Sequence, residues 1–187
     1  MKKISLSMLL LVLGTAVFAQ KKLNPKIKAN SVINYTLTQN GQDAPLVLTF
    51  NSLGNPTKFD WNIDGYGSGT FEMTAKALQS GKGTKTNTRE PDVITKLPDY
   101  QTFACISKDA YNDMLKNQTF EYDGLKYKVA LNDSLGFRLK DRDWDVTRVV
   151  AVNGKGEIWI LNNPDFPLIC KTKDNAQGMD LSLISVQ

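Results

Sequence analysis

Ile33-Asn34-Tyr35-Thr36-Leu37 alternates apolar with polar side chains and runs into the turn pair Asn40-Gly41. The same alternation returns in 46–50 and in 59–63, and each of these stretches also leads into glycine-containing turn residues. A period of two is typical of a β-strand with one buried face, and Asn-Gly is typical of a tight hairpin turn. This region therefore predicts successive antiparallel strands joined by short turns.

The C-terminal half of the chain repeats this pattern. Asp123-Gly124 and Asn153-Gly154 each separate two strand-like stretches, and the chain ends with two more such stretches, 168–172 and 179–186. Both turn pairs favour hairpins. In total the sequence predicts about ten strands.

One longer segment, 107–117, has helical periodicity instead. Ser107 is a good N-cap, and the apolar residues that follow it recur at the spacing of one helix face. Thr74 caps a single shorter turn, 75–80. We therefore expect a fold of the mainly β to α+β class: a single curved antiparallel sheet or half barrel of about ten strands, with one helix packed on it.

The first 19 residues have the three parts of a secretory signal peptide. Lys2 and Lys3 form the positive start, an apolar run follows, and Val17-Phe18-Ala19 offers small residues at the cleavage positions. The run is shorter than the roughly 20 residues of a membrane-spanning helix. We expect an exported protein, periplasmic or extracellular, with no transmembrane segment in its mature part.

The remainder of the 187 residues is expected to form a basic tail, 20–30, and a single β-rich domain, 31–187. Removal of Lys2 and Lys3 with the leader lowers the formal net charge from +4 to +2. No run of Lys or Arg interleaves with aromatic residues along the chain, so nucleic acid is not an expected partner.

The chain has no histidine and two cysteines, Cys105 and Cys170. The absence of histidine excludes Ser-His and Cys-His catalytic pairs and histidine ligation of zinc. Both cysteines stand in apolar, strand-like stretches. In an oxidising compartment they either form a disulfide or remain two buried thiols, and the sequence leaves both alternatives open.

One motif matches a metal-binding loop in part. Asp60, Asn62 and Asp64, followed by Gly65, match the first six positions of a calcium-binding loop. Phe71 occupies the position at which that loop needs its closing glutamate. The apolar residues between the polar ones equally fit a half-buried strand that ends in a turn. We therefore expect no cofactor, with calcium as the one metal to consider.

Three segments carry a resemblance to known proteins. They are 59–73, with its Phe-Asp-Trp start; 97–111; and 157–169, with its Asn-Pro-x-x-Pro-Leu turn. Together they resemble an uncharacterised group of exported proteins common in the Bacteroidota. That resemblance implies no catalytic residue. More loosely, an exported sheet curved around one helix is similar to the half barrels of lipoprotein carriers, which implies an apolar concave face suited to an acyl chain.

The first functional hypothesis is a non-enzymatic binding protein that holds a lipid or another hydrophobic small molecule between the sheet and the helix 107–117. The candidate wall residues are Tyr111, Met114, Leu115, Trp144 and Trp159. The second hypothesis is a protein–protein interaction module of the cell envelope, which requires an exposed aromatic patch. The third is a hydrolase that uses two facing carboxylates, which composition alone does not exclude.

Overall fold

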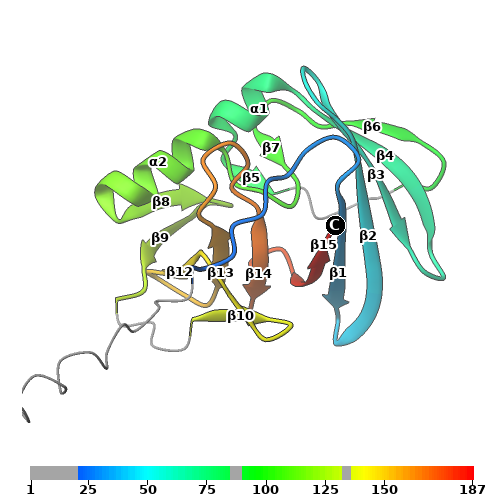
Figure 1. Ribbon diagram of the computed structural model, residues 1–187. Helices are drawn as coiled ribbons and strands as arrows, with labels where there is room; N and C mark the ends of the chain where they lie inside the picture. Colours follow the sequence, from blue (N-terminus) through cyan, green and yellow to red (C-terminus); the bar gives the residue numbers. More distant parts are fainter. Residues whose placement is uncertain (1–20, 85–89, 132–135) are drawn as a thin grey trace, which may run out of the picture.

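The computed structural model describes residues 21–84, 90–131 and 136–187 (Figure 1). The predicted signal peptide, 1–19, lies outside these residues. Eleven strands form one sheet. In order across the sheet they are β6 (Ile94–Lys96), β4 (Gly67–Met73), β3 (Thr57–Ile63), β2 (Gln42–Leu53), β1 (Val32–Gln39), β15 (Met179–Val186), β14 (Ile169–Lys173), β13 (Glu157–Leu161), β12 (Val146–Ala151), β9 (Leu125–Val129) and β8 (Thr119–Tyr122).

The predicted fold class is confirmed. The sheet is open, with β6 and β8 as its two edges, and it curves and twists so that β1–β4 stand at an angle to β12–β14 (Figure 1). Neighbouring strands are antiparallel except β4 and β6, which run parallel. β6 therefore makes the sheet mixed, which the alternating pattern did not predict.

The hairpins follow the predicted turn pairs. β1 and β2 meet at Asn40 and Gly41, whose φ angles are 53° and 75°. β8 and β9 meet at Asp123 and Gly124, with φ angles of 51° and 73°. A type I′ turn needs positive φ at both central residues, and Asn, Asp and Gly tolerate that conformation best. These local residues thus fix both hairpins.

The two halves of the sheet join through the first and last strands. β1 pairs with β15, so that Tyr35 stands opposite Leu183 and Leu37 opposite Leu181. The backbone N–H groups of Val32 and Gln187 each donate to the carbonyl of the other, at 3.0 and 2.9 Å. The sheet is thus continuous only because the two ends of the domain meet at its centre.

The buried side chains form two clusters. We call the face of the sheet that carries them on β1–β4, and that carries Ile158 and Ile160 on β13, the inner face; Leu161, at an alternate position of β13, also belongs to the large core. The large core fills the inner face of β1–β4 and β15 and includes a run of aromatic side chains: Tyr35, Phe50, Phe59, Trp61, Phe71 and Phe103. The helix core lies over β8, β9, β12 and β13. Its side chains on the sheet include Tyr127, Val149, Ile158 and Ile160.

Two helices cover part of the inner face. In α2 (Lys108–Asn117) the Ser107 hydroxyl accepts a hydrogen bond from the N–H of Ala110, as predicted for an N-cap. In α1 (Ala75–Ser80) the Thr74 hydroxyl accepts one from the N–H of Ala77 at 3.0 Å. The expected single turn at 75–80 is therefore a short helix, and it adds a second helix beside the predicted one.

Two small sheets were not predicted. β10 (Phe137–Leu139) pairs with β11 (Arg142–Trp144), and β5 (Gly83–Thr84) pairs with β7 (Gln101–Thr102). The β10–β11 turn has positive φ at Lys140 and Asp141, 48° and 59°. Lys-Asp is not a strong signal for such a turn, so sequence alone gave little indication of this hairpin.

The expected basic tail is part of the fold and crosses the molecule as a strap (residues 21–30; Figure 1). Its lysines are exposed, as expected, but Leu23 forms a bridge to Trp144 and Ile27 is only 8% exposed in the large core. The Asn24 amide also donates to the carbonyl of Asn162 at 2.6 Å. The segment expected as a basic tail is thus packed against the domain through its apolar residues, whose burial outweighs the segment's high lysine content.

Candidate functional site

The groove predicted between the sheet and the helix 107–117 is filled. Tyr111 is 4% exposed and Met114 is fully buried, and both pack in the helix core against Phe120, Tyr127 and Ile158. Side chains packed in this way leave no room for a ligand. These two predicted wall residues are therefore core residues.

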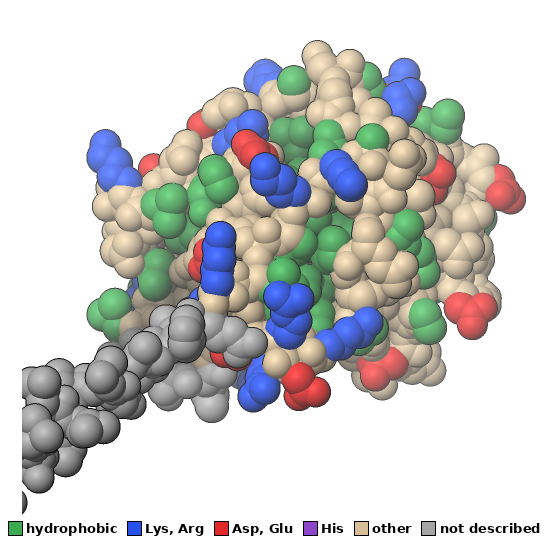
Figure 2. All heavy atoms as spheres, viewed as in Figure 1, with side chains coloured by type: hydrophobic (Ala, Val, Ile, Leu, Met, Phe, Trp, Pro, Cys, Tyr) green, Lys and Arg blue, Asp and Glu red, His purple; other side chains and the backbone are tan. Residues whose placement is uncertain are grey.

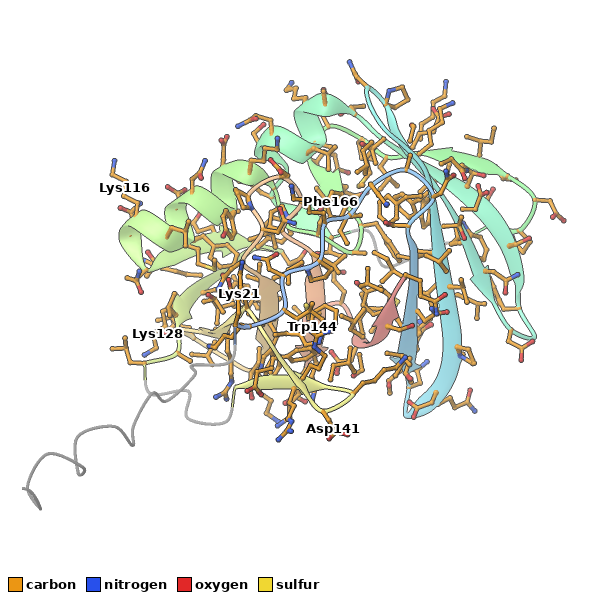
Figure 3. All side chains as sticks on the ribbon, viewed as in Figure 1. Lys21, Lys116, Lys128, Asp141, Trp144 and Phe166 are labelled. Atoms are coloured by element: carbon orange, nitrogen blue, oxygen red, sulfur yellow. The ribbon has the colours of Figure 1, made fainter. Side chains whose placement is uncertain are left out.

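The other three predicted wall residues lie elsewhere. Leu115 is on the solvent side of α2 and is 52% exposed, although its helical spacing suggested the buried face. Trp144, at the end of β11, packs in the large core beneath the strap (Figure 3). Trp159 pairs with Arg148 and Lys171, on the face of the sheet opposite Ile158 and Ile160. The five residues thus do not line one groove, because strand alternation and helix rotation send them to different sides.

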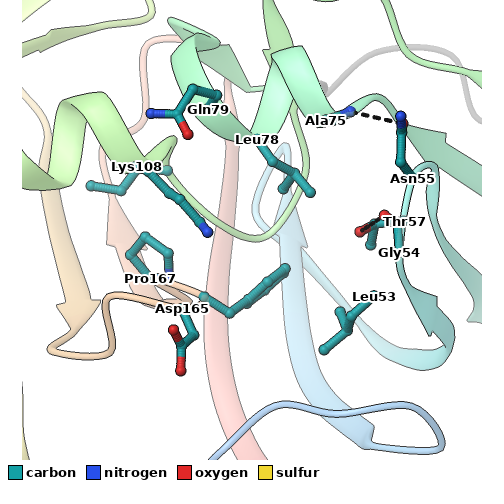
Figure 4. A pocket seen from close by; sticks show the side chains of 12 residues that line it. Leu53, Gly54, Asn55, Thr57, Ala75, Leu78, Gln79, Lys108, Asp165 and Pro167 are labelled. Atoms are coloured by element: carbon teal, nitrogen blue, oxygen red, sulfur yellow. Dashed lines mark hydrogen bonds between the residues drawn. The ribbon is translucent and has the colours of Figure 1, made fainter.

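A pocket does exist between the sheet and the other helix. It has a volume of about 310 Å³ and lies where α1, the β2–β3 turn and the loop before β14 meet (Figure 4). In the space-filling view, hydrophobic side chains gather in a hollow down the middle of the molecule, with lysines and arginines around it (Figure 2). The pocket is lined by Leu53, Gly54, Asn55, Thr57, Ala75, Leu78, Gln79, Ile106, Lys108, Asp165, Phe166 and Pro167.

Short-range hydrogen bonds hold the walls of this pocket in place. The Asn55 side chain accepts a hydrogen bond from the N–H of Ala75 at 3.3 Å, which ties the β2–β3 turn to the start of α1. The Thr57 hydroxyl donates to the Gly54 carbonyl at 3.1 Å. The first bond is exposed and the second is partly buried. Together they fix the conformation of the turn and connect it to the helix.

Phe166 forms the floor of the pocket. The Asn163 side chain accepts hydrogen bonds from the N–H groups of Asp165 and Phe166, at 3.0 and 3.4 Å. This turn directs the Phe166 ring inward, where it lies edge-on to Phe50 at a centroid distance of 5.2 Å. The ring is 4% exposed. The Asn-Pro-x-x-Pro-Leu turn of the sequence thus has a specific role, which is to present an aromatic floor.

Polar groups stand at the rim. Gln79 donates from its side-chain amide to the Asp109 carboxylate at 2.7 Å. Lys108, at the start of α2, and Asp165, in the loop, are both exposed. Asp165 is the single carboxylate among the lining residues. An apolar floor with a few polar groups at its mouth is typical of a site that binds a small molecule, whereas hydrolysis by paired carboxylates requires a second acid.

A second, polar pocket lies between α2 and the edge strand β8, beside the packed helix core. It has a volume of about 270 Å³ and is lined mainly by hydroxyl, amide and charged side chains of α2 and β8, including Asp109, Asp113 and Glu121. Lys82 and Lys126 stand in the same lining and offset part of this negative charge. Among the described residues no group of three or more His, Cys, Asp or Glu side chains could hold a metal ion.

The calcium candidate has an extended conformation. Asp60 and Asn62 lie within β3 and are exposed, and Asp64 follows the end of the strand. The Asp60 carboxylate accepts a hydrogen bond from the Thr70 hydroxyl of β4 at 2.6 Å. A calcium loop must wrap around its ion, and a paired strand cannot do so. The three residues therefore do not form the loop that the motif suggests.

The two cysteines are buried free thiols in the structure. Cys105 forms a single antiparallel bridge with Leu168, which makes Cys170 its diagonal neighbour on the facing strand. Diagonal neighbours lie about 7–8 Å apart, whereas a disulfide joins Cα atoms about 4.4–6.8 Å apart. Closing the disulfide would therefore require the two strands to shift. Burial raises the pKa of Cys105 to about 12 and that of Cys170 further, so neither is an activated nucleophile.

The sequence did not predict the pocket because its walls come from four separate segments. Residues 53–57, 75–79, 106–108 and 165–167 are brought together only by the fold, and only the last of these segments belongs to a recognisable pattern. The Asn-Pro-x-x-Pro-Leu turn was the one available signal, since its two prolines make a rigid loop beside an aromatic residue. Within the described ranges no helix has the length and hydropathy of a membrane span. The chain matches no protein-family model and no curated protein.

Proposed function

We propose that this protein is an exported, non-enzymatic binding protein that holds a small hydrophobic molecule in the pocket beside α1. The observation that carries the proposal is the apolar lining, in which Leu53, Leu78, Ile106 and Phe166 converge on one space of about 310 Å³. Its size is at the lower end of the range for small-molecule sites. The kinship with exported proteins of the Bacteroidota type is part of the same proposal and rests on the sequence resemblance and the leader.

The volume limits what the pocket accommodates. A space of about 310 Å³ is close to the smallest that small-molecule pockets have. This suits a short acyl chain or a single ring system. A whole lipid with two long chains exceeds it. The proposed ligand is therefore one apolar chain or ring, with any polar end left at the rim near Gln79 and Lys108.

The paired-carboxylate hydrolase has less support. Asp165 stands without a second acid among the lining residues, and its side chain is exposed. That chemistry needs two carboxyl groups on opposite sides of the substrate.

An envelope protein partner is a second candidate, and one observation favours it. Tyr66, Val93 and Ile94 are 55%, 42% and 60% exposed beside or within the edge strand β6. An exposed edge strand with apolar side chains can be extended by a strand of another protein. A pull-down in which the wild-type chain captures a partner protein and Ile94→Lys does not would favour this candidate, provided that no ligand is found in the pocket.

The test uses the fluorescent apolar probe N-phenyl-1-naphthylamine, whose emission rises in an apolar site. We expect the wild-type chain to bind it saturably with micromolar affinity. Leu53→Trp places a bulky ring at the mouth of the pocket and should weaken binding at least tenfold, because Leu53 lines the space and is 37% exposed. The matched control is Leu115→Trp, on the exposed side of α2 outside the pocket.

Two results would contradict the proposal. One is the absence of saturable binding by the wild-type chain, and the other is equal loss of binding in the two variants. Native mass spectrometry of protein purified from its own host supplies a second readout. A co-purified adduct that is removed by mild organic extraction, and that is missing from Leu53→Trp, is the expected result.

A further inference from the structure

The face of β9, β12, β13 and β14 opposite the helix core, which we call the outer face, carries a group of cations. Two neighbouring cross-strand rows create it. In one row, Lys128, Val150, Glu157 and Lys173 stand side by side on β9, β12, β13 and β14. In the next row, Arg148, Trp159 and Lys171 stand side by side on β12, β13 and β14. We call Lys128, Arg148, Lys171, Lys173 and Trp159 the outer basic face.

Trp159 is at the centre of this face and is half-buried. The Arg148 guanidinium lies 5.4 Å from the centroid of its ring, and the Lys171 ammonium lies 5.1 Å from it. Both distances are within the range of a cation–π contact. The ring therefore holds two cations close together in the middle of the sheet, where like charges would otherwise repel one another.

The charge on this face is unbalanced. Within the described residues, the outer face of β9, β12, β13 and β14 carries one carboxylate, Glu157, against five cations, which are Lys126 and the four of the outer basic face. Two carboxylates flank these strands on the same face, Glu121 on β8, opposite Lys126, and Asp180 on β15. Glu157 is bound to Arg148 at 2.5 Å and to Lys173 at 3.8 Å. The Lys173 side chain nevertheless remains 58% exposed, and Lys128 extends from the edge of the molecule (Figure 3). Five cations against three carboxylates leave an excess of two positive charges on this face.

We propose that the outer basic face binds the phosphate-bearing surface of an anionic lipid membrane. Three features of this face favour a membrane over a soluble acidic protein. The cations lie in two rows on the regular surface of a sheet and not in a cleft. A tryptophan stands among them, and tryptophan prefers the membrane interface. Ile184, on the outer face of the neighbouring strand β15, is 45% exposed and adds an apolar contact.

The proposal concerns a different part of the molecule from the pocket beside α1, and the two can be tested separately. None of the five residues of the outer basic face lines the pocket beside α1, although Trp159 also packs against the large core. Loss of vesicle binding therefore leaves probe binding in the pocket unchanged.

The experiment is co-sedimentation of the full chain with vesicles of two compositions, pure phosphatidylcholine and phosphatidylcholine with 30% phosphatidylglycerol. We expect binding to the anionic vesicles only, and loss of binding when the ionic strength rises to about 0.5 M, where the screening length falls well below 10 Å. Each basic residue near an anionic surface strengthens binding about fivefold. The triple variant Lys128→Gln, Lys171→Gln, Lys173→Gln should therefore bind about a hundredfold more weakly.

The matched control removes the same charge elsewhere. Lys28→Gln, Lys96→Gln and Lys116→Gln are exposed positions outside the outer basic face, so this triple variant should retain binding within a few-fold. Thermal unfolding of both triple variants checks that each is folded. The proposal is overturned if anionic vesicles bind no more protein than neutral ones, or if the two triple variants weaken binding equally. Binding of a single-stranded oligonucleotide through the same residues, without vesicle binding, would also overturn it and would indicate a soluble polyanion as the partner.

Discussion

At the scale of single residues, Gly69 has a structural role that no neighbouring glycine shares. It lies on β4 opposite Trp61, and a Cβ atom at this position would come within 3.0 Å of three atoms of the indole ring. Trp61 is fully buried, and its indole N–H has no hydrogen-bond partner in the described part of the chain. The ring is thus held by packing alone, which makes it sensitive to any added atom.

We expect Gly69→Ala to lower the free energy of unfolding by about 1–3 kcal/mol, since overpacking a filled core forces side chains or backbone to move. Urea unfolding followed by tryptophan fluorescence measures the change. Gly54→Ala is the control, because nothing lies within 4 Å of a Cβ atom there. Equal stability of Gly69→Ala and the wild type would contradict this account of the site.

The buried thiols give a second prediction at this scale. Burial raises the pKa of Cys105 to about 12 and also raises that of Cys170, so at pH 8 almost no thiolate forms in the folded protein. We expect no alkylation of native protein by iodoacetamide within minutes, and alkylation of both residues in urea. The intact mass then shows two added groups. A mass two hydrogens lower, with no alkylation even in urea, would instead reveal the disulfide that the sequence also allows.

At the scale of elements, the strap shows how two apolar residues can fix a segment that is otherwise polar. Leu23 exchanges backbone hydrogen bonds with the neighbours of Trp144: its N–H donates to Asp143 and its carbonyl accepts from Asp145, at 2.8 and 2.9 Å. Ile27 then enters the large core. The remaining contacts are mainly polar and exposed, so the side chain of Ile27 contributes much of the docking free energy.

We expect Ile27→Ala to destabilise the protein by about 2 kcal/mol, the lower end of the range for truncation of a buried aliphatic side chain. It should also speed hydrogen exchange at Leu23 and Asn30, whose N–H groups bond to Asp143 and Phe50. Lys28→Ala removes an exposed side chain from the same strap and serves as the control. If exchange were faster equally in both variants, the strap would be held by something other than Ile27.

The β8–β9 hairpin supplies a prediction that depends on pH. Asp123 accepts hydrogen bonds from the Thr84 N–H at 2.6 Å and from its hydroxyl at 3.0 Å. Burial nevertheless raises the pKa of this carboxyl, more than the two bonds from Thr84 lower it. A carboxyl whose pKa is higher in the folded state favours folding while it is protonated, and that contribution is lost as the pH rises through its folded pKa.

Asp123→Asn should therefore become more stable relative to the wild type as the pH increases from 3 to 7. Asparagine also accepts the Thr84 hydrogen bond and tolerates the positive φ of this turn position, 51°. Urea unfolding of both proteins at a series of pH values measures the difference. A difference that shrinks with rising pH would show that the Asp123 carboxylate is stabilising in the folded protein.

At the scale of the whole molecule, the sequence predicted the features that depend on residues close together in the chain. It missed the features that depend on the order of the strands in the sheet. The hairpin at Asn40-Gly41 and the N-cap at Ser107 are encoded within a few residues, and both are as predicted. Which strand stands beside β1 is decided by the packing of the whole inner face, and no local pattern records it. The prediction that five residues line one groove was wrong for the same reason. Those residues were chosen by residue type, without knowledge of the side of the sheet on which each one lies.

The pocket and the outer basic face both show this limit. The pocket brings Leu53 and Phe166 together across more than a hundred residues. The outer basic face places Arg148, Trp159 and Lys171 in one row, although they are never closer than eleven positions in the chain. A search along the sequence for cations interleaved with aromatic residues therefore finds nothing, while the register of three strands creates that arrangement.

The pairing of β1 with β15 also has a consequence for how the chain acquires its structure. The central pair of the sheet joins 32–39 to 179–186, so it closes one of the longest loops in the molecule, and contacts of such large sequence separation slow folding. Until the last strand has been synthesised, β1 and β14 each present an unpaired edge in the middle of the unfinished sheet. Such edges invite association with other chains. A chain that is still being synthesised and lacks β15 cannot complete this sheet.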